Sequence, residues 1–283
     1  MPELPEVEVL ARHLAPLVRN RKIQRVDVRR ARVILPSTVE AFSQTLRGAT
    51  FVELTRRGKY LLFEMRVSKG AGFPLVGHLG MTGRMYLQPA KSPLPKHAAV
   101  VLELGEENFV FEDTRYFGRL TLDDSAIAAL GPEPLGEAFT AEYFALALQR
   151  STQPIKVKLL DQQLVAGVGN IYSSEALFRA SISPRLPARS LKSQQVARLL
   201  QTIRETLRDA IKRGSTISLN YSDDGKSDGL FYFGGAPDAQ DFYEERLKVY
   251  DRAGKPCRVC KTPIKRIVQG ARSTFYCPNC QRR

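Results

Sequence analysis

YLLFEM at residues 60–65 is a run of apolar and aromatic residues interrupted by one charge, Glu64. Similar runs recur through the first half of the chain: IQRVDV (23–28), LVGHLG (75–80), RMYLQ (84–88), AVVLEL (99–104) and NFVFED (108–113). They are rich in Val, Leu, Phe and Tyr and are separated by Gly, Pro and charges, which is typical of short β-strands. Because helical patterns do not alternate with these runs, we expect an antiparallel sandwich or barrel.

Helical patterns stand on both sides of this strand-rich region. Near the N-terminus, apolar residues follow a 3.6-residue period at Val7, Leu10, Leu14, Leu17 and Val18. Pro5 suits an early helical position, where its missing N–H needs no partner. A second stripe, which we interpret as core packing, ends at Gly214 and consists of Val196, Leu199, Leu200, Ile203, Leu207 and Ile211.

The charge balance indicates an anionic partner. The 283 residues include 43 Lys and Arg against 29 Asp and Glu, a formal net charge of +14. Nucleic acid is the leading candidate, with a solubility surface or an acidic membrane as alternatives. No apolar run approaches the length of a membrane span, so we expect no membrane partner. The N-terminal MPELPEVEV lacks the features of a signal peptide, which favours a cytoplasmic protein.

The four cysteines form two pairs with the spacing of a zinc site. Cys257 and Cys260 are followed, after sixteen residues, by Cys277 and Cys280. Two CxxC pairs can surround one zinc ion with four thiolates, which leaves no open coordination position and predicts a structural zinc. Two disulfides are the alternative, and a reducing compartment disfavours them.

The segment between the two cysteine pairs predicts a basic β-hairpin. IKRIV and RSTFY flank Gln269-Gly270, and residues 252–283 contain nine Lys or Arg and no Asp or Glu. A hairpin ordered by zinc and carrying this charge is well suited to a phosphate backbone. A solvated basic tail is the alternative.

Five motifs in this order resemble the formamidopyrimidine-DNA glycosylase family, bacterial enzymes that remove 8-oxoguanine and ring-opened purines. The motifs are MPELPEVE (1–8), HLGMTG (78–83), DTRYFG (113–118), GVGNIYSSEALF (167–178) and the two CxxC pairs. The resemblance covers essentially the whole chain. It implies an α+β fold of two domains: an N-terminal antiparallel β-sandwich with flanking helices, and a helix–two-turn–helix domain with a zinc-finger β-hairpin.

The patterns along the chain also suggest domain boundaries. We expect a catalytic domain at residues 1–130, a linker at 131–142, a helical DNA-binding domain at 143–245 and a zinc finger at 246–283. The linker overlaps the stretch LGPEPLGEAF, whose Pro and Gly content favours a connecting segment.

By the same resemblance, removal of the initiator methionine exposes Pro2, whose amine attacks C1′ of the damaged nucleotide. A terminal amine has a pKa of roughly 8, so a useful fraction is unprotonated at neutral pH. Glu3 matches the general acid–base, and Glu6 lies on the same face of the first helical turn, where it orients the site or caps the helix. Lys59 matches the lysine of β-elimination and phosphate contact, and Arg272 the arginine of δ-elimination.

Three positions resemble the wedge that fills the space of an extruded base: Met81, Arg115 and Phe117. The resemblance implies that Arg115 contacts the cytosine left unpaired by base extrusion, while Met81 and Phe117 fill space from the tips of Gly-rich loops. His78 is expected to support the Met81 loop. Taken alone, Met81 and Phe117 are more typical of core residues.

Further DNA contacts follow from the resemblance. Lys156 and Asn170 match phosphate-clamping positions of the helix–two-turn–helix motif, and His97 matches another DNA contact. One basic position of the family falls on Ser151, so the adjacent Arg150 is the candidate there.

The chain also departs from the family pattern. Thr114 stands where Pro is commoner, and Tyr116 stands where Arg is commoner. The second difference reduces the positive charge beside the wedge. The loop at about 215–245 looks longer than usual and contains aromatic residues that could stack on an extruded base: Tyr221, Phe231, Tyr232 and Phe233.

The expected function is therefore a glycosylase and AP lyase that acts as a monomer on damaged double-stranded DNA. The intact wedge favours oxidised purines over the pyrimidine lesions of endonuclease VIII-like relatives. A catalytically silent zinc-containing DNA-binding protein is the alternative from another class, and the match at Pro2, Glu3 and Lys59 argues against it.

Overall fold

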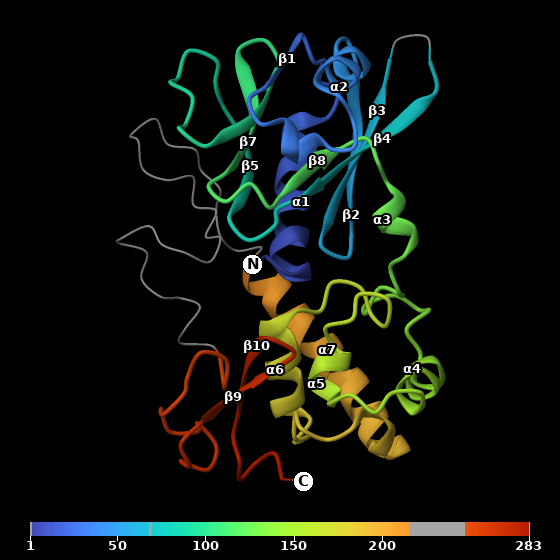
Figure 1. The fold of residues 1–283 in the computed structure, drawn as a ribbon, viewed down its shortest axis with the longest axis vertical. Coiled ribbons are helices and arrows are strands. Elements are labelled where there is room, and N and C mark those ends of the chain that lie inside the picture. The colour runs from blue at the N-terminus through green and yellow to red at the C-terminus, as the bar shows by residue number, and fades with distance from the viewer. Residues whose placement is uncertain (1, 68–69, 215–246, 283) are drawn as a thin grey trace. The chain divides into compact units, whose positions relative to one another are not determined.

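The computed structural model of the chain describes residues 2–67, 70–214 and 247–282 (Figure 1). These residues form two compact units: the first contains residues 2–129 and Gly214, and the second contains residues 130–213 and 247–282. The predicted loop at 215–245, with its four aromatic residues, lies outside the described residues. Among the helices that are described, none has both the length and the apolar character that a membrane crossing requires.

Two four-stranded sheets make up the first unit, and their pairings are antiparallel. The strand orders are β1-β6-β7-β5 and β2-β3-β4-β8. The strands are β1 (Arg25–Val28), β2 (Thr50–Arg57), β3 (Tyr60–Arg66), β4 (Gly72–His78), β5 (Gly83–Pro89), β6 (Ala98–Glu103), β7 (Glu107–Asp113) and β8 (Arg119–Thr121). Each of the six predicted runs contains a strand. The sequence prediction missed β2 and β8.

An aromatic cluster joins the two sheets and makes them a sandwich. Phe51 of β2 and Phe63 of β3 belong to one sheet, and Phe109 of β7 to the other. The ring centroid of Phe109 lies 6.0 Å from that of Phe51 and 5.7 Å from that of Phe63. All three side chains are fully buried. The sandwich, one of the two architectures that the sequence allowed, is therefore confirmed.

Helix α1 (Leu4–Val18) packs into the same core through Val7, Leu10 and Leu14. Leu17 shares their period but is 46% exposed, so its expected place in the apolar face is wrong. In the last turn of the helix, Val18 packs in the core and Leu17 does not. Three shorter helices complete this part of the chain: η1 (Ala31–Ile34), α2 (Val39–Leu46) and α3 (Ser125–Ala128).

The second unit is helical. Its helices are α4 (Ala141–Gln149), α5 (Ile155–Lys158), α6 (Asn170–Arg179), η2 (Ala188–Ser190) and α7 (Ser193–Gly214). All six residues of the predicted stripe on α7 are buried, which confirms the interpretation as core packing. On another face of α7, Arg204 donates hydrogen bonds to the carbonyl oxygens of Pro134, Gly136 and Phe139. These bonds hold the Pro- and Gly-rich segment against the helix.

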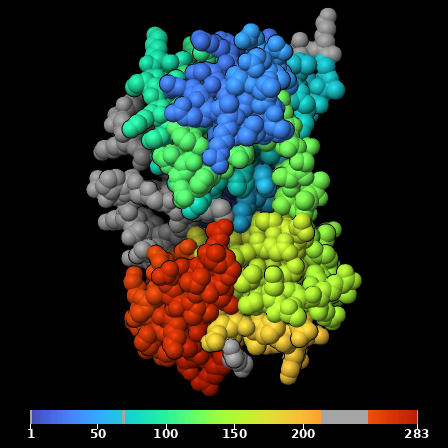
Figure 2. Space-filling model, in the orientation of Figure 1, coloured from blue at the N-terminus to red at the C-terminus, as the bar shows by residue number. Residues whose placement is uncertain are grey.

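The predicted hairpin consists of β9 (Lys265–Gln269) and β10 (Arg272–Tyr276). Gly270 and Ala271 both have positive φ, 54° and 57°, as a tight two-residue hairpin turn requires. A small core joins the hairpin to α6, because Phe275, Ile264 and Val249 pack with Phe178 of that helix. In Figure 2 the orange and red atoms of this segment lie against the yellow and green atoms of the same unit.

Candidate active site and nucleic-acid interface

The N-terminus of α1 places Pro2 and Glu3 side by side at a helix start. Both are buried, and Glu3 is the N-cap in an extended conformation. The backbone N–H of Glu3 donates a 2.8 Å hydrogen bond to the carboxylate of Glu6. Glu6 therefore caps the helix, and this cap also fixes the backbone on which Glu3 and Pro2 stand. The positive end of the helix dipole lies at this position.

An ion-pair network ties α1 to the turn that carries Lys59. Arg56 of β2 donates a 2.7 Å hydrogen bond to Glu8 of α1 and a 3.0 Å hydrogen bond to the carbonyl oxygen of Gly58. Arg12 donates to the other oxygen of Glu8. Burial alone would raise the pKa of Glu8, but the hydrogen bonds and the positive charges of Arg56 and Arg12 together outweigh burial and lower that pKa. The network thus fixes the turn of Lys59 against the helix of Pro2 and Glu3.

Lys59 and His78 lie together at one end of the β3–β4 pair. Lys59 is only 7% exposed. Burial, together with the charges of Lys59 and Arg119, lowers the pKa of His78 to about 4, so its imidazole is neutral at pH 7. The Nδ1 atom of that ring accepts a 3.2 Å hydrogen bond from the backbone N–H of Gly80. His78 thereby holds the loop that carries Met81.

The three wedge candidates come from two loops, and Arg115 contacts each of the other two. The guanidinium of Arg115 lies 4.7 Å from the ring centroid of Phe117 and donates to the sulfur of Met81 at 3.2 Å. Met81 is 39% exposed and Phe117 45%, so neither is a core residue. A cation and two apolar side chains thus form one exposed projection of the first unit.

Tyr116, a departure from the family pattern, contacts His97 and Arg30. Its backbone has φ 53°. Its hydroxyl is 3.3 Å from Nδ1 of His97, and the guanidinium of Arg30 lies 5.1 Å from its ring centroid. The motif itself has lost a charge, but Arg30 brings a cation to this place from a distant part of the sequence. The sequence reasoning missed Arg30 because no local pattern relates it to residue 116.

In the second unit, Lys156, Asn170 and the basic hairpin are connected. Lys156 is fully buried, and its ammonium donates a hydrogen bond to the side-chain oxygen of Asn170. The Asn170 amide donates a 3.0 Å hydrogen bond to the carbonyl oxygen of Ser273, the neighbour of Arg272. Arg272 is exposed at the start of β10. Arg150 is exposed at the C-cap of α4, and no bond seen among the described residues joins it to this group.

Glu175 of α6 holds the chain that leads into the zinc segment. Its carboxylate, 4% exposed, accepts three 2.9 Å hydrogen bonds from the backbone N–H groups of Lys248, Val249 and Tyr250. The sequence reasoning did not single out this glutamate, although it lies within the GVGNIYSSEALF motif. The available signal was that Glu175 is the one charged residue between Ile171 and Phe178.

The four cysteine sulfurs have the spacing of a tetrahedral zinc site. The Sγ atoms of Cys257 and Cys280 are 3.8 Å apart, and those of Cys260 and Cys277 3.4 Å. All four lie within 4.8 Å of one another. Four sulfurs at about 2.3 Å from zinc in a tetrahedron stand about 3.8 Å apart, so the residues fit the ion. All four cysteines are free, which contradicts the alternative of two disulfides.

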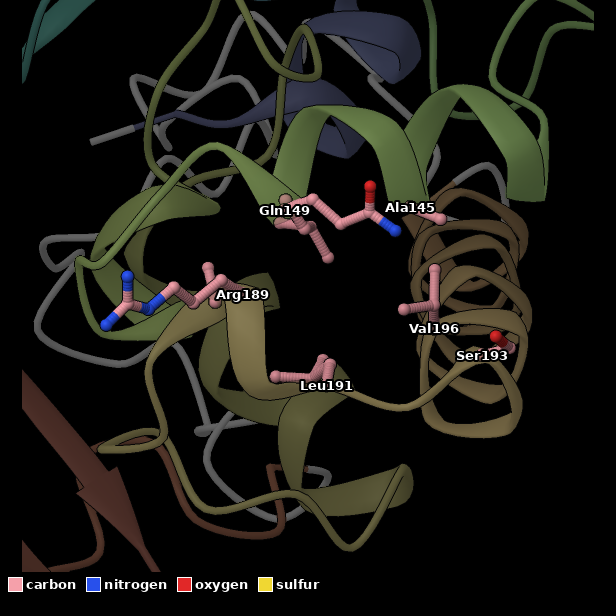
Figure 3. A pocket seen from close by; sticks show the side chains of 8 residues that line it. Ala145, Gln149, Arg189, Leu191, Ser193 and Val196 are labelled. Atoms are coloured by element: carbon pink, nitrogen blue, oxygen red, sulfur yellow. The ribbon is translucent and has the colours of Figure 1, made fainter.

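A small pocket of the second unit lies elsewhere, between α4, η2 and the start of α7 (Figure 3). Its lining consists of Ala145, Leu148, Gln149, Ala188, Arg189, Leu191, Ser193 and Val196. In Figure 3 the side chain of Arg189 points away from the other labelled side chains. None of the predicted catalytic or DNA-contacting residues lines this pocket, so the candidate site is not located there.

Comparison with known families gives three matches along the chain. Residues 1–120 match the formamidopyrimidine-DNA glycosylase N-terminal domain, and residues 130–221 match the helix–two-turn–helix domain of the same family. Residues 254–283 match a zinc finger found in this family and in isoleucyl-tRNA synthetases.

Relatives and solved structures agree over the full length. The chain is 41% identical to a formamidopyrimidine-DNA glycosylase of Burkholderia thailandensis and covers 100% of both proteins. It is 39% identical to one of Desulfitobacterium hafniense, with 99% of this chain and 100% of that protein covered. A Lactococcus lactis enzyme bound to DNA containing a formamidopyrimidine lesion has a TM-score of 0.85 at 33% identity, with 99% and 100% coverage.

The same Lactococcus lactis enzyme bound noncovalently to DNA with an abasic site has a TM-score of 0.84 at 32% identity, with 99% of this chain and 100% of that chain covered. The family matches, the full-length relatives and the shared α+β fold agree with the zinc-ligand geometry described above. This chain belongs to the formamidopyrimidine-DNA glycosylase family.

Proposed function

We propose that this chain is a bifunctional DNA glycosylase and AP lyase that removes oxidised purines, 8-oxoguanine and formamidopyrimidines, from double-stranded DNA. The observation that carries the proposal is the capped start of α1, where Pro2 and the buried Glu3 stand beside each other. The Arg56–Glu8 ion pair fixes the Lys59 turn against the same helix. This arrangement combines a terminal amine, a carboxyl group and a lysine, which amine-dependent glycosylase and lyase chemistry requires.

In the proposed reaction, the Pro2 amine forms a bond to C1′ while the bond from C1′ to the damaged base breaks. The base departs with the electron pair of the broken bond and takes up the proton that the Pro2 nitrogen loses. Glu3 protonates the sugar ring oxygen, the bond between that oxygen and C1′ breaks, and the opened sugar remains attached to Pro2 as an iminium ion. The iminium acts as the electron sink for loss of the proton at C2′ and departure of the 3′ phosphate. Lys59 contributes to this β-elimination. Arg272 promotes departure of the 5′ phosphate, so the product has a one-nucleoside gap.

The remaining residues are proposed to open and hold the DNA. Met81, Arg115 and Phe117 fill the space of the extruded base, which offsets an unstacking cost of a few kcal/mol. Asn170, His97 and Arg150 contact the DNA backbone. Lys156 is buried, so we assign it an effect through Asn170, whose amide it holds in place. The four-cysteine zinc site orders the basic hairpin that carries Arg272.

Other parts of the proposal concern the whole chain. We infer a monomer that acts in the cytoplasm, with no membrane partner. The boundaries proposed for its domains are residues 1–130, 131–142, 143–245 and 246–283. The Arg30–Tyr116 contact adds a proposed phosphate-binding cation to the interface.

Replacing Arg30 by alanine should weaken DNA binding in a salt-dependent manner. Each phosphate contact contributes about one unit to the slope of log affinity against log salt concentration, so Arg30→Ala should reduce that slope by about 1. The measurement is fluorescence anisotropy with one duplex at several salt concentrations. The neighbouring Arg29 is also exposed and serves as the matched control, with a smaller expected change. An unchanged slope for Arg30→Ala, or an equal change for Arg29→Ala, contradicts this contact.

The decisive test of the proposed function uses lesion-containing duplexes and borohydride. The mature chain should give a covalent trapped complex and a cleaved strand with 8-oxoguanine opposite cytosine. It should process that lesion faster than thymine glycol. A clear preference for thymine glycol would favour an endonuclease VIII-like activity instead. Binding of DNA without any trapped complex, even with a preformed abasic site, would leave a non-catalytic DNA-binding protein.

A further inference from the structure

Asp113 is a fully buried carboxylate at the end of β7 that accepts hydrogen bonds from both wedge loops. Its Oδ1 atom accepts from the hydroxyl of Thr82 at 2.5 Å and from the backbone N–H of Arg115 at 3.1 Å. Its Oδ2 atom accepts from the backbone N–H of Gly118 at 2.8 Å. Thr82 follows Met81, whereas Arg115 and Gly118 enclose Phe117. One carboxylate therefore joins the three wedge side chains through their own loops.

The two loops also touch each other directly at glycines. A Cβ atom on Gly80 would lie 2.6 Å from the backbone nitrogen of Gly118, and Gly80 has φ +60°. A Cβ atom on Gly118 would lie 2.8 Å from the carbonyl oxygen of His78 and 3.2 Å from Oδ2 of Asp113. No side chain fits between these backbones. The close approach and the shared carboxylate make the two loops one rigid base for the wedge.

We infer that Asp113 is a positioning residue for base extrusion, which fixes Met81, Arg115 and Phe117 together without contacting the DNA itself. This inference rests on the proposed function, because it assigns a role within the opening step. A wedge that is already ordered does not have to lose conformational freedom when it enters the DNA stack, so more of its contact energy opposes unstacking. Loosening either loop should therefore slow the opening of a paired lesion.

Asparagine is the informative substitution because it preserves the size of the side chain. Its amide has one oxygen acceptor and one NH₂ donor, whereas the carboxylate has two acceptors. When the oxygen of the asparagine amide points toward Thr82 and Arg115, its NH₂ group points toward the backbone N–H of Gly118, so two donors face each other. With the amide turned, the Gly118 bond survives and the Thr82 hydroxyl can accept from the NH₂ group, but the backbone N–H of Arg115 loses its acceptor. In either orientation, Asp113→Asn leaves one backbone N–H of the loop that carries Arg115 and Phe117 facing the amide NH₂ without an acceptor, which loosens that loop on the shared side chain.

The experiment compares single-turnover cleavage of two duplexes by the full-length chain. One duplex contains 8-oxoguanine paired with cytosine, and the other a preformed abasic site opposite cytosine, which has no base pair to open. For Asp113→Asn, the ratio of the two rate constants should fall about tenfold or more relative to the unaltered chain. A poorly folded preparation loses active molecules for both substrates, so it does not change this ratio. Thr82→Val, which keeps both carboxylate oxygens, should give a smaller fall.

Glu175→Gln is the matched control, because Glu175 is another buried carboxylate that accepts hydrogen bonds from three backbone N–H groups, but belongs to the other unit. It should leave the ratio unchanged even where it lowers the melting temperature. A 2-aminopurine base next to the lesion reports opening directly, and its fluorescence increase at saturating enzyme should be smaller with Asp113→Asn.

The outcomes separate this inference from the proposed function. An unchanged ratio in Asp113→Asn, together with an undiminished 2-aminopurine signal, overturns the positioning role. An equal fall in Glu175→Gln also overturns it, because the effect would then belong to any buried carboxylate. Absence of 8-oxoguanine cleavage by the unaltered chain contradicts the proposed function instead.

Discussion

A chain that retains extra residues before Pro2 should form no borohydride-trapped complex with either an 8-oxoguanine or an abasic duplex. The preceding residues convert the Pro2 nitrogen into a tertiary amide, which has no basic lone pair for attack on C1′. Strand cleavage should fall on the order of 10³-fold or more, as expected when a covalent nucleophile is removed. The helix cap from Glu6 to the backbone of Glu3 lies beyond the modified bond, so folding should be preserved.

The matched control uses the same extended chain after proteolytic removal of the extra residues. Trapping should return once Pro2 is again the terminal residue, while affinity for DNA should be similar before and after cleavage. Persistent trapping by the extended chain would identify a different nucleophile. Lys59 would then be the first candidate, because it is the lysine whose turn is fixed against α1.

Loss of zinc should have the second large effect, and it should act on DNA binding. Structural zinc sites of this class contribute roughly 10–16 kcal/mol of binding free energy in isolated peptides, so the hairpin is not expected to stay ordered without the ion. The described residues 252–282 contain eight Lys or Arg, which would then lose their fixed positions. We expect Cys277→Ser to reduce the salt slope of DNA affinity by about 2 or more.

The measurements are zinc content, with one ion expected for each chain, and anisotropy titrations at several salt concentrations. Chelation of the unaltered chain should reproduce the effect of Cys277→Ser, and added zinc should reverse it only in the unaltered chain. Glu175 anchors residues 248–250 by bonds that do not involve the cysteines, so the segment should remain attached to α6. Full DNA affinity in a zinc-free chain would contradict the proposed role of the hairpin.

Local patterns in the sequence determined much of the fold and the metal site. The strand at residues 60–65, the apolar face of α7 and the hairpin around Gly270 follow from periodicity and turn chemistry, which act between near neighbours. The zinc ligands follow from two CxxC spacings. The resemblance to the family supplied the candidates Pro2 and Glu3. Without it, a proline and a glutamate before a helix do not indicate an active site.

Only the tertiary structure decided which distant residues support these sites. Asp113 joins Thr82 to Gly118, and Arg30 lies over Tyr116, although neither pairing has a fixed spacing in the chain. The exposure of Leu17 likewise depends on where the core ends and not on its helical period. Hydrogen bonds and packing between separate loops depend on three-dimensional approach, which local periodicity does not encode. The sequence therefore determined the elements and the metal ligands, and the tertiary structure decided how the loops around the site are held.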